Sequence, residues 1–142
     1  MSLSKEQEYA FDKYKKGENL LLTGPGGTGK SKLIRNFINY SISINQRAQA
    51  TALTGCAAIL LGMNAKTIHS WSGIKIAKGK QDQIIEQALR SKRVRQRWLS
   101  VKTLIIDEAS MMSKKIFDLL NALGRRIRYD ERPFGGIQIV CV

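Results

Sequence analysis

The sequence predicts one α/β domain of three layers, with helices on both faces of a mainly parallel sheet. Short apolar runs typical of buried strands alternate with segments whose apolar residues recur at helical spacing. A glycine-rich loop joins the first apolar run to the first long helix, and an acidic pair follows a later apolar run. With 142 residues, of which 43% are hydrophobic, the chain is long enough for one domain with its own core.

The first elements follow from local signals. Ser4 and Gln7 have the spacing of a capping box, which predicts a helix that ends near Gly17. Residues 19–23 form a short apolar run, which is typical of a strand buried on both faces of a parallel sheet. The next helix is predicted by apolar residues at helical spacing: Leu33, Ile34, Phe37 and Ile38.

The middle of the chain continues the alternation. Residues 47–53 predict a second strand, and residues 54–62 a turn followed by a short apolar helix that ends at Gly62. A loop then leads to residues 67–71. Beyond it, apolar residues at helical spacing from Ile84 to Leu89 predict a helix that runs on through a basic stretch to Arg97.

The last part repeats the pattern once more. Residues 103–106 predict a strand, and Ser113 caps the helix that follows it. A turn at residues 133–136 precedes a final strand over residues 137–142.

The formal net charge of +13, from 24 Lys and Arg against 11 Asp and Glu, predicts a polyanionic partner, with nucleic acid favoured over anionic lipid. The alternative is a basic surface that is only solvated. The distribution favours a partner, because no acidic residue lies between Glu18 and Asp82, a tract that contains the glycine-rich loop.

The lack of a recognisable targeting signal and the few cysteines predict an intracellular protein. No apolar run approaches the roughly 20 residues of a membrane span, and the first residues lack the apolar core of a secretory signal. Cys56 and Cys141 are far apart and have no partner spacing for a metal or a disulfide framework. A reduced, intracellular setting is therefore expected, although the sequence does not distinguish between compartments.

The glycine-rich loop, TGPGGTGKS at residues 23–31, matches two phosphate-binding patterns. The dinucleotide pattern is matched by Gly24, Gly26 and Gly29. The P-loop pattern is matched by Gly24, Gly29, Lys30 and Ser31. A dinucleotide site needs an acid about 20 residues further on to hold a ribose hydroxyl, and this tract has none. The loop is therefore interpreted as a P-loop.

A P-loop binds phosphates through converging backbone N–H groups and the positive end of the following helix. Lys30 is expected to reach the β- and γ-phosphates of ATP, and the Ser31 hydroxyl to ligate Mg²⁺. The predicted nucleotide-binding residues of the loop are Gly24, Pro25, Gly26, Gly27, Thr28, Gly29, Lys30 and Ser31.

Asp107 and Glu108 follow the strand over residues 103–106. Open α/β sheets bind ligands at the carboxyl ends of their strands, so both acids are expected to face the nucleotide. Asp107 is predicted to hold Mg²⁺ and Glu108 to polarise the attacking water as a general base. The alternative is that Glu108 only caps the helix that follows. An adjacent Asp-Glu pair favours a hydrolysing motor ATPase over a simple kinase.

Three further features each have two interpretations. Gln7 completes the capping box or contacts adenine through its amide. Residues 67–71, TIHSW, combine hydroxyls, an imidazole and an aromatic ring, as single-stranded nucleic-acid sites do; alternatively, Trp71 is a core residue and His69 a structural hydrogen-bonding group. The basic stretch with Arg93, Arg95 and Arg97 is a solvated helix face or tracks a phosphate backbone, and Trp98 beside it is expected in the core.

Taken together, these segments resemble the Pif (petite integration frequency) family of 5′-to-3′ DNA helicases, in superfamily one and close to RecD-type enzymes. LSKEQEYAFD at residues 3–12 is similar to the family's Q motif, and TGPGGTGKS to motif I. LIIDEASMMS at residues 104–113 is similar to motif II. The resemblance implies a RecA-like P-loop NTPase domain in which Gln7 contacts adenine.

The more specific part of the resemblance lies between motifs I and II. Residues 52–62 (ALTGCAAILLG) and 65–74 (AKTIHSWSGI) are similar to motif Ia and to the family's threonine-isoleucine-histidine-serine-aromatic element. Residues 132–140 (RPFGGIQIV) are similar to the approach to motif III. By position, the resemblance implies contacts with single-stranded DNA from Thr54, Gly55, His69, Ser70 and Trp71.

The resemblance extends from Leu3 to Val142 and implies ATP-driven translocation along single-stranded DNA with strand separation at forks, G-quadruplexes or RNA–DNA hybrids. It implies roles in repair, recombination and replication, with ATP and Mg²⁺ as cofactors. DNA with single-stranded/duplex junctions is the expected partner, with no membrane partner, and the protein alone is expected to be monomeric.

The family continues past Val142 with the rest of motif III and a second motor domain, which are not within these residues. Residues 1–142 are therefore expected to be the first motor domain, binding nucleotide weakly and unable to unwind DNA alone. Two other interpretations are a clamp-loader-like P-loop ATPase and a non-catalytic basic nucleic-acid-binding module. Intact Lys30, Asp107 and Glu108 argue against the second of these.

Overall fold

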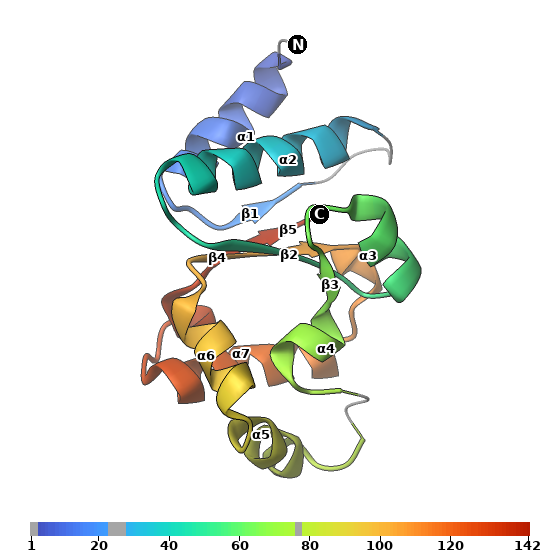
Figure 1. The fold of residues 1–142 in the computed structure, drawn as a ribbon, viewed down its shortest axis with the longest axis vertical. Helices are drawn as coiled ribbons and strands as arrows, with labels where there is room; N and C mark the ends of the chain where they lie inside the picture. The colour runs from blue at the N-terminus through green and yellow to red at the C-terminus, as the bar shows by residue number, and fades with distance from the viewer. Residues whose placement is uncertain (1–2, 23–27, 76–77) are drawn as a thin grey trace.

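The computed structural model describes residues 3–22, 28–75 and 78–142, and within them helices cover both faces of one sheet (Figure 1). The strand order is β1-β5-β4-β2-β3, and every neighbouring pair is parallel. The predicted three-layer α/β class is confirmed. The bounds of the strands are β1 Leu20–Leu21, β2 Ala48–Ala52, β3 Lys66–Thr67, β4 Thr103–Asp107 and β5 Gln138–Cys141.

One helical layer consists of α1 (Lys5–Lys15) and α2 (Thr28–Ser43), which lie above the sheet in Figure 1. The predicted capping box of α1 is confirmed. The Ser4 hydroxyl accepts from the backbone N–H of Gln7, and the Gln7 side-chain oxygen accepts from the backbone N–H of Ser4. Apolar residues of α1 and α2 pack on this face, joined by Leu61 of α3 (Gly55–Leu61).

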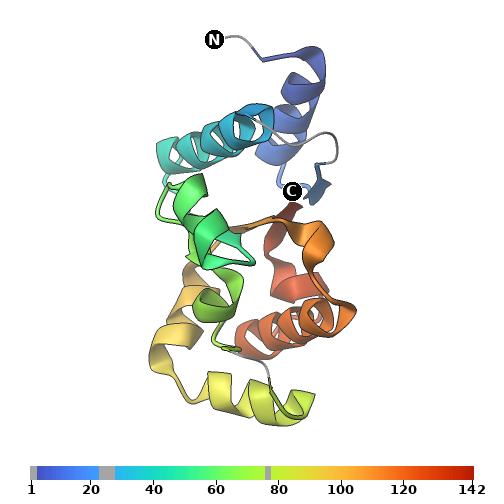
Figure 2. The ribbon, with the colours of Figure 1, turned by 90° about the vertical axis from the view of Figure 1, so that its right-hand side faces the viewer.

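The other layer consists of the four helices α4 (Ile68–Ser72), α5 (Gln81–Leu89), α6 (Lys92–Ser100) and α7 (Lys114–Arg128). They lie below the sheet in Figure 1 and in the view turned by 90° (Figure 2), where α5 is farthest from α1. Two short 3₁₀ helices, η1 (Ala109–Met111) and η2 (Pro133–Gly136), flank α7. Its predicted cap is confirmed, since the Ser113 hydroxyl accepts from the Ile116 N–H.

The alternation of side chains along β4 connects the two layers. Ile105 packs with the α1–α2 layer, whereas Leu104 and Ile106 pack with the layer of α4 to α7. All three side chains are fully buried. A central parallel strand that is covered on both faces is apolar for this reason. The acidic pair lies at the end of this buried strand.

The prediction that the first strand is buried on both faces is wrong. β1 is an edge strand that pairs only with β5 among the described residues, and the Leu21 side chain is 72% exposed. An apolar run indicates a strand but not its place in the sheet, because the strand order is set by the crossover connections. Residue 23 of the predicted strand lies outside the described residues.

The predicted continuous helix from residue 84 to 97 is two helices. Ser91 begins α6 as its N-cap and accepts a hydrogen bond from the Val94 N–H at 3.3 Å. The break turns the chain so that Ile84, Ile85 and Val94 all reach the same core. No described helix is both long and apolar enough to cross a membrane.

Candidate nucleotide and nucleic-acid site

The carboxyl ends of all five strands lie at the same edge of the sheet, because every pair is parallel. In the register, Ala52 of β2 is opposite both Asp107 of β4 and Thr67 of β3. Beyond β1, the Leu22 N–H donates to the Cys141 carbonyl at 2.8 Å. The segments that carry the predicted site residues therefore leave the sheet side by side at one edge.

The helix after the glycine-rich loop begins at this edge. Gly29, Lys30 and Ser31 lie in the first turn of α2, which contains no acidic residue, so the positive end of the helix dipole is left uncompensated there. Lys30 is half-buried and Ser31 exposed. The remaining predicted loop residues, Gly24, Pro25, Gly26 and Gly27, lie outside the described residues, as does the side chain of Thr28.

Gln7 joins the N-terminal helix to this turn. Its amide Nε2 donates to the Gly29 carbonyl at 3.4 Å, while its Oε1 accepts from the Ser4 N–H at 2.9 Å. The capping role is therefore present in the structure. The Gln7 side chain also contacts Gly29 of the predicted nucleotide loop. The capping box therefore fixes the Gln7 amide beside this loop, where the adenine contact is predicted.

Asp107 is the last residue of β4, and Glu108 follows it. The Asp107 carboxylate oxygen Oδ1 accepts from the Glu108 N–H at 2.9 Å. Glu108 has a left-handed backbone (φ 61°, ψ 31°), and its side chain makes no capping hydrogen bond to η1. The structure therefore does not support the alternative that the Glu108 side chain only caps the next helix. A positive φ is uncommon for a residue other than glycine, and the extended course of β4 ends at this residue.

Thr54 connects the acidic pair to the end of β2. Its hydroxyl donates to Glu108 Oε1 at 3.5 Å and accepts from the Ala57 N–H at 3.1 Å, which makes it the N-cap of α3. Thr54 and Gly55 are both exposed. One hydroxyl therefore links the carboxylate predicted to activate water with a segment predicted to contact DNA.

The predicted contact of the Trp71 ring with single-stranded DNA does not fit the structure. Trp71 is 2% exposed and its ring lies 5.0 Å from that of Trp98, between centroids, inside the core. The alternative interpretation, Trp71 as a core residue, is the one observed. His69 is half-buried and Ser70 exposed, so this element still offers polar groups to solvent.

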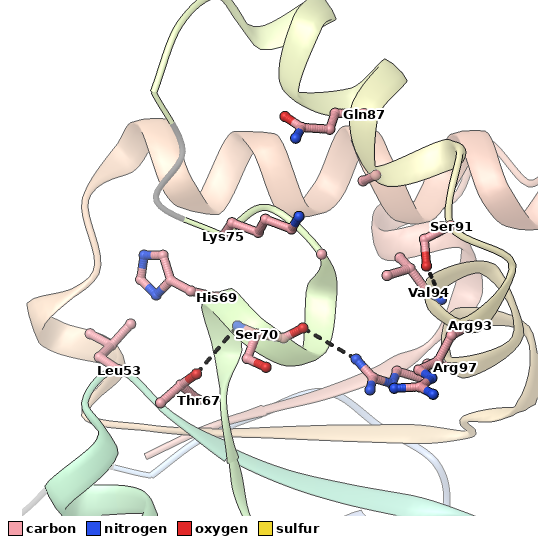
Figure 3. Close-up of a pocket in the computed structure, with 12 residues that line it drawn as sticks. Leu53, Thr67, His69, Ser70, Lys75, Gln87, Ser91, Arg93, Val94 and Arg97 are labelled. Carbon is pink, nitrogen blue, oxygen red and sulfur yellow. Dashed lines mark hydrogen bonds between the residues drawn. The ribbon is translucent and has the colours of Figure 1, made fainter.

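Helix α4, which carries His69 and Ser70, is held by α6. The Arg97 guanidinium donates to the carbonyls of Ser70 and Trp71 at 3.2 and 3.3 Å, and Figure 3 shows the first of these bonds. The Trp98 indole N–H donates to the Ser72 carbonyl at 3.1 Å. A cation and a donor at the C-terminal end of a short helix satisfy carbonyls that have no partner within it.

These contacts revise the interpretation of the basic stretch. Arg97 is bound to carbonyls of α4, and Arg95 donates to the Leu89 carbonyl, so neither is simply solvated. Sequence inspection missed them, because Arg97 and Ser70 are 27 residues apart and nothing local marks the pair. The Thr54–Glu108 contact spans 54 residues and was missed for the same reason. The Ser91 cap, by contrast, is a local signal that a helix begins there.

Comparison with known proteins identifies similar chains. The family model of the PIF1-like helicases matches residues 2–142. The chain is 43% identical over 141 residues to the ATP-dependent DNA helicase PIF5 of Trypanosoma brucei brucei, covering 98% of this chain and 15% of that relative.

The fold is similar to that of crystal structures of Pif1 helicases. The Pif1 helicase from Candida albicans superposes with a TM-score of 0.90 at 38% identity, covering 99% of this chain and 32% of that one. The Bacteroides Pif1 bound to single-stranded DNA has a TM-score of 0.79 at 28% identity, with 99% and 32% covered. The chain thus spans less than a third of these proteins.

Proposed function

Because this chain belongs to the PIF1-like helicase family, we propose that residues 1–142 are the first RecA-like motor domain of an ATP-dependent 5′-to-3′ DNA helicase. The observation that carries the proposal is the link at the sheet edge, where Thr54 joins the acidic pair of β4 to the segment after β2. A site for ATP and a site for DNA would meet at this point. The relative with 43% identity is named as an ATP-dependent DNA helicase, which supports this function.

The nucleotide would occupy the edge formed by α2, β1 and β4. The first turn of α2 offers N–H groups and Lys30 to the phosphates of ATP, and Gln7 contacts the adenine beside Gly29. Glu108 accepts a proton from the attacking water, for which its side chain, free of any cap, is suited.

The donor set at the end of β4 fits Mg²⁺. One oxygen of Asp107 accepts the Glu108 N–H, and its other oxygen has no hydrogen bond to the described residues. Within those residues no three His, Cys, Asp or Glu gather as a metal cluster. Mg²⁺ binds through one or two carboxylates plus substrate phosphates, so Asp107 and Ser31 would hold it. When bound, it neutralises charge on the phosphate oxygens.

Single-stranded DNA would cross the ends of β2 and β3. Thr54 and Gly55 at the start of α3 offer exposed polar groups, and His69 and Ser70 offer others from α4. Phosphates are bound by such hydroxyls and N–H groups. Trp71 acts indirectly, because its buried ring packs under α4 and supports the helix. The Bacteroides relative was crystallised bound to single-stranded DNA, which supports single-stranded DNA as the partner.

Lys30→Ala in the full-length natural protein tests this proposal. ATP turnover in the presence of single-stranded DNA is expected to fall by about 10²-fold, because the phosphates lose a positioned cation. Lys32→Ala, a change of the same charge on the same helix, is the control and is expected to retain turnover. The two rates are measured by phosphate release at saturating DNA.

Two results would contradict the proposal. Wild-type protein with no ATP turnover, with or without DNA, excludes the motor and leaves a basic nucleic-acid-binding module. Turnover that Lys30→Ala abolishes but that DNA does not stimulate favours a P-loop ATPase of another kind, such as the clamp-loader-like alternative.

Replacement of Thr54 tests the link between the two sites. Thr54→Asp retains an N-cap for α3 but removes the donor to Glu108 and adds a like charge. The kcat for ATP at saturating single-stranded DNA is expected to fall by about 10–100-fold with little change in KM, because the base loses its orientation. Thr54→Ser keeps both hydrogen bonds and is expected to restore the rate. Wild-type kcat in Thr54→Asp would show that the contact has no role.

A further inference from the structure

A cavity of about 770 Å³ lies beside α4, between the end of β2 and the corner of α5 and α6 (Figure 3). His69 and Ser70 form one wall, and Arg93 and Arg97 of α6 another. Ligand pockets in proteins have about 300–1,000 Å³, so the volume is sufficient for a bound group. The nucleotide site described above shares none of the residues of this cavity.

The chemistry of the walls is that of a site for a nucleotide unit. Leu53, Ala88 and Val94 provide apolar surface, and Gln87 adds an amide. The lining contains no carboxylate. The nearest acid along α5, Glu86, does not line the cavity and pairs with Arg126 of α7 at 3.3 Å. The positive charge of the cavity is therefore not neutralised by its own walls.

Two of its cations are available to a ligand. Lys75 and Arg93 are exposed, and neither side chain has a hydrogen bond or an ion pair with the residues that the structure describes. In Figure 3, the Lys75 side chain extends across the cavity. Arg97, one turn from Arg93 on α6, is already engaged by the carbonyls of α4. Two arginines on the same face of α6 therefore have different tasks: Arg97 positions α4, and Arg93 remains available to bind an anion.

We propose that this cavity binds single-stranded DNA beyond His69 and Ser70, with Lys75 and Arg93 each contacting a phosphate and one base resting on the apolar surface at Leu53 and Val94. The inference rests on the proposed function, because His69 and Ser70 are the residues through which the strand would reach the cavity. An apolar surface bordered by cations suits a base and its phosphates. A membrane surface is less suitable, because a flat bilayer does not enter a recess.

The test compares two double variants of the full-length natural protein that remove the same charge. Lys75→Gln/Arg93→Gln changes the cavity. The control, Lys92→Gln/Lys115→Gln, changes exposed cations outside it, one of them next to Arg93 on α6. Affinity for a fluorescein-labelled oligothymidylate is measured by anisotropy over a salt series. All four positions are exposed, so both variants are expected to fold, and circular dichroism checks this.

Loss of two phosphate contacts is expected to lower the slope of log affinity against log salt by about 1.4, since each contact with a single strand contributes about 0.7. Between 50 and 200 mM salt, the loss of affinity of the cavity variant is then about 7-fold smaller than that of wild type. The control is expected to retain the wild-type slope.

The other outcomes overturn the inference. An equal change in both variants shows that net charge, not the cavity, is responsible. A wild-type slope in the cavity variant excludes the cavity while the proposed function stands. Loss of binding to phosphatidylserine vesicles, with unchanged DNA binding, assigns the cations to a lipid surface. A wild-type protein that binds no single-stranded DNA refutes the proposed function and this inference with it.

Discussion

In the full-length natural protein, Glu108→Gln is expected to lower kcat for DNA-stimulated ATP hydrolysis by about 10²–10⁴-fold while ATP binding is retained. The amide has the shape of the carboxylate but cannot accept a proton from water, and general-base catalysis contributes rate enhancements of this size. Gln also leaves an acceptor for the Thr54 hydroxyl, which contacts Glu108 Oε1 at 3.5 Å. The substitution therefore separates basicity from position.

Glu131→Gln is the matched control, because Glu131 is exposed and far along the chain from the strand that carries Glu108. It is expected to hydrolyse ATP at the wild-type rate. Turnover is followed by phosphate release, and binding by the fluorescence of a methylanthraniloyl ATP analogue. A Glu108→Gln protein that binds the analogue and still turns over within about threefold of wild type would assign the base to another group.

In the 142-residue chain, Trp98→Ala is expected to lower the free energy of unfolding by about 3–5 kcal/mol, the cost typical of a buried Trp replaced by Ala. Trp98 is fully buried, packs against Trp71 and donates its indole N–H to the Ser72 carbonyl. The variant removes the largest fully buried side chain and leaves a cavity between α4, α6 and α7.

Leu99→Ala on the same helix is the control for Trp98→Ala. Leu99 is 57% exposed, so its truncation is expected to change stability by less than about 0.5 kcal/mol. Both free energies are measured by urea denaturation followed by far-ultraviolet circular dichroism. A loss below about 1 kcal/mol in Trp98→Ala would show that α6 does not hold α4 through this ring.

The local part of the fold was predictable because its signals are close in sequence. The capping box joins residues three apart, and α7 begins at its predicted Ser113 cap. The central strand was predicted from the apolar run at residues 103–106, and β4 (Thr103–Asp107) includes all of these residues. The break at Ser91 was also within reach, since a serine before a helical segment is a common N-cap.

The candidate site was predictable in composition but not in its connections. The residue types of the P-loop and of Asp107–Glu108 carry their chemistry at a recognisable spacing. The sequence contains no sign that Thr54 contacts Glu108 or that Arg97 holds α4, because each contact depends on the order and direction of strands in the sheet.

The sequence by itself determined the kinds of element, the acid-free basic tract and the residues that suit ATP and Mg²⁺. The tertiary structure decided that β1 lies at the edge with Leu21 exposed, and that Trp71 is buried against Trp98. The physical reason is that helix caps and apolar periodicity act over a few residues. Burial of a ring is decided by every element that packs on it, and for Trp71 that includes a helix beginning 21 residues further on.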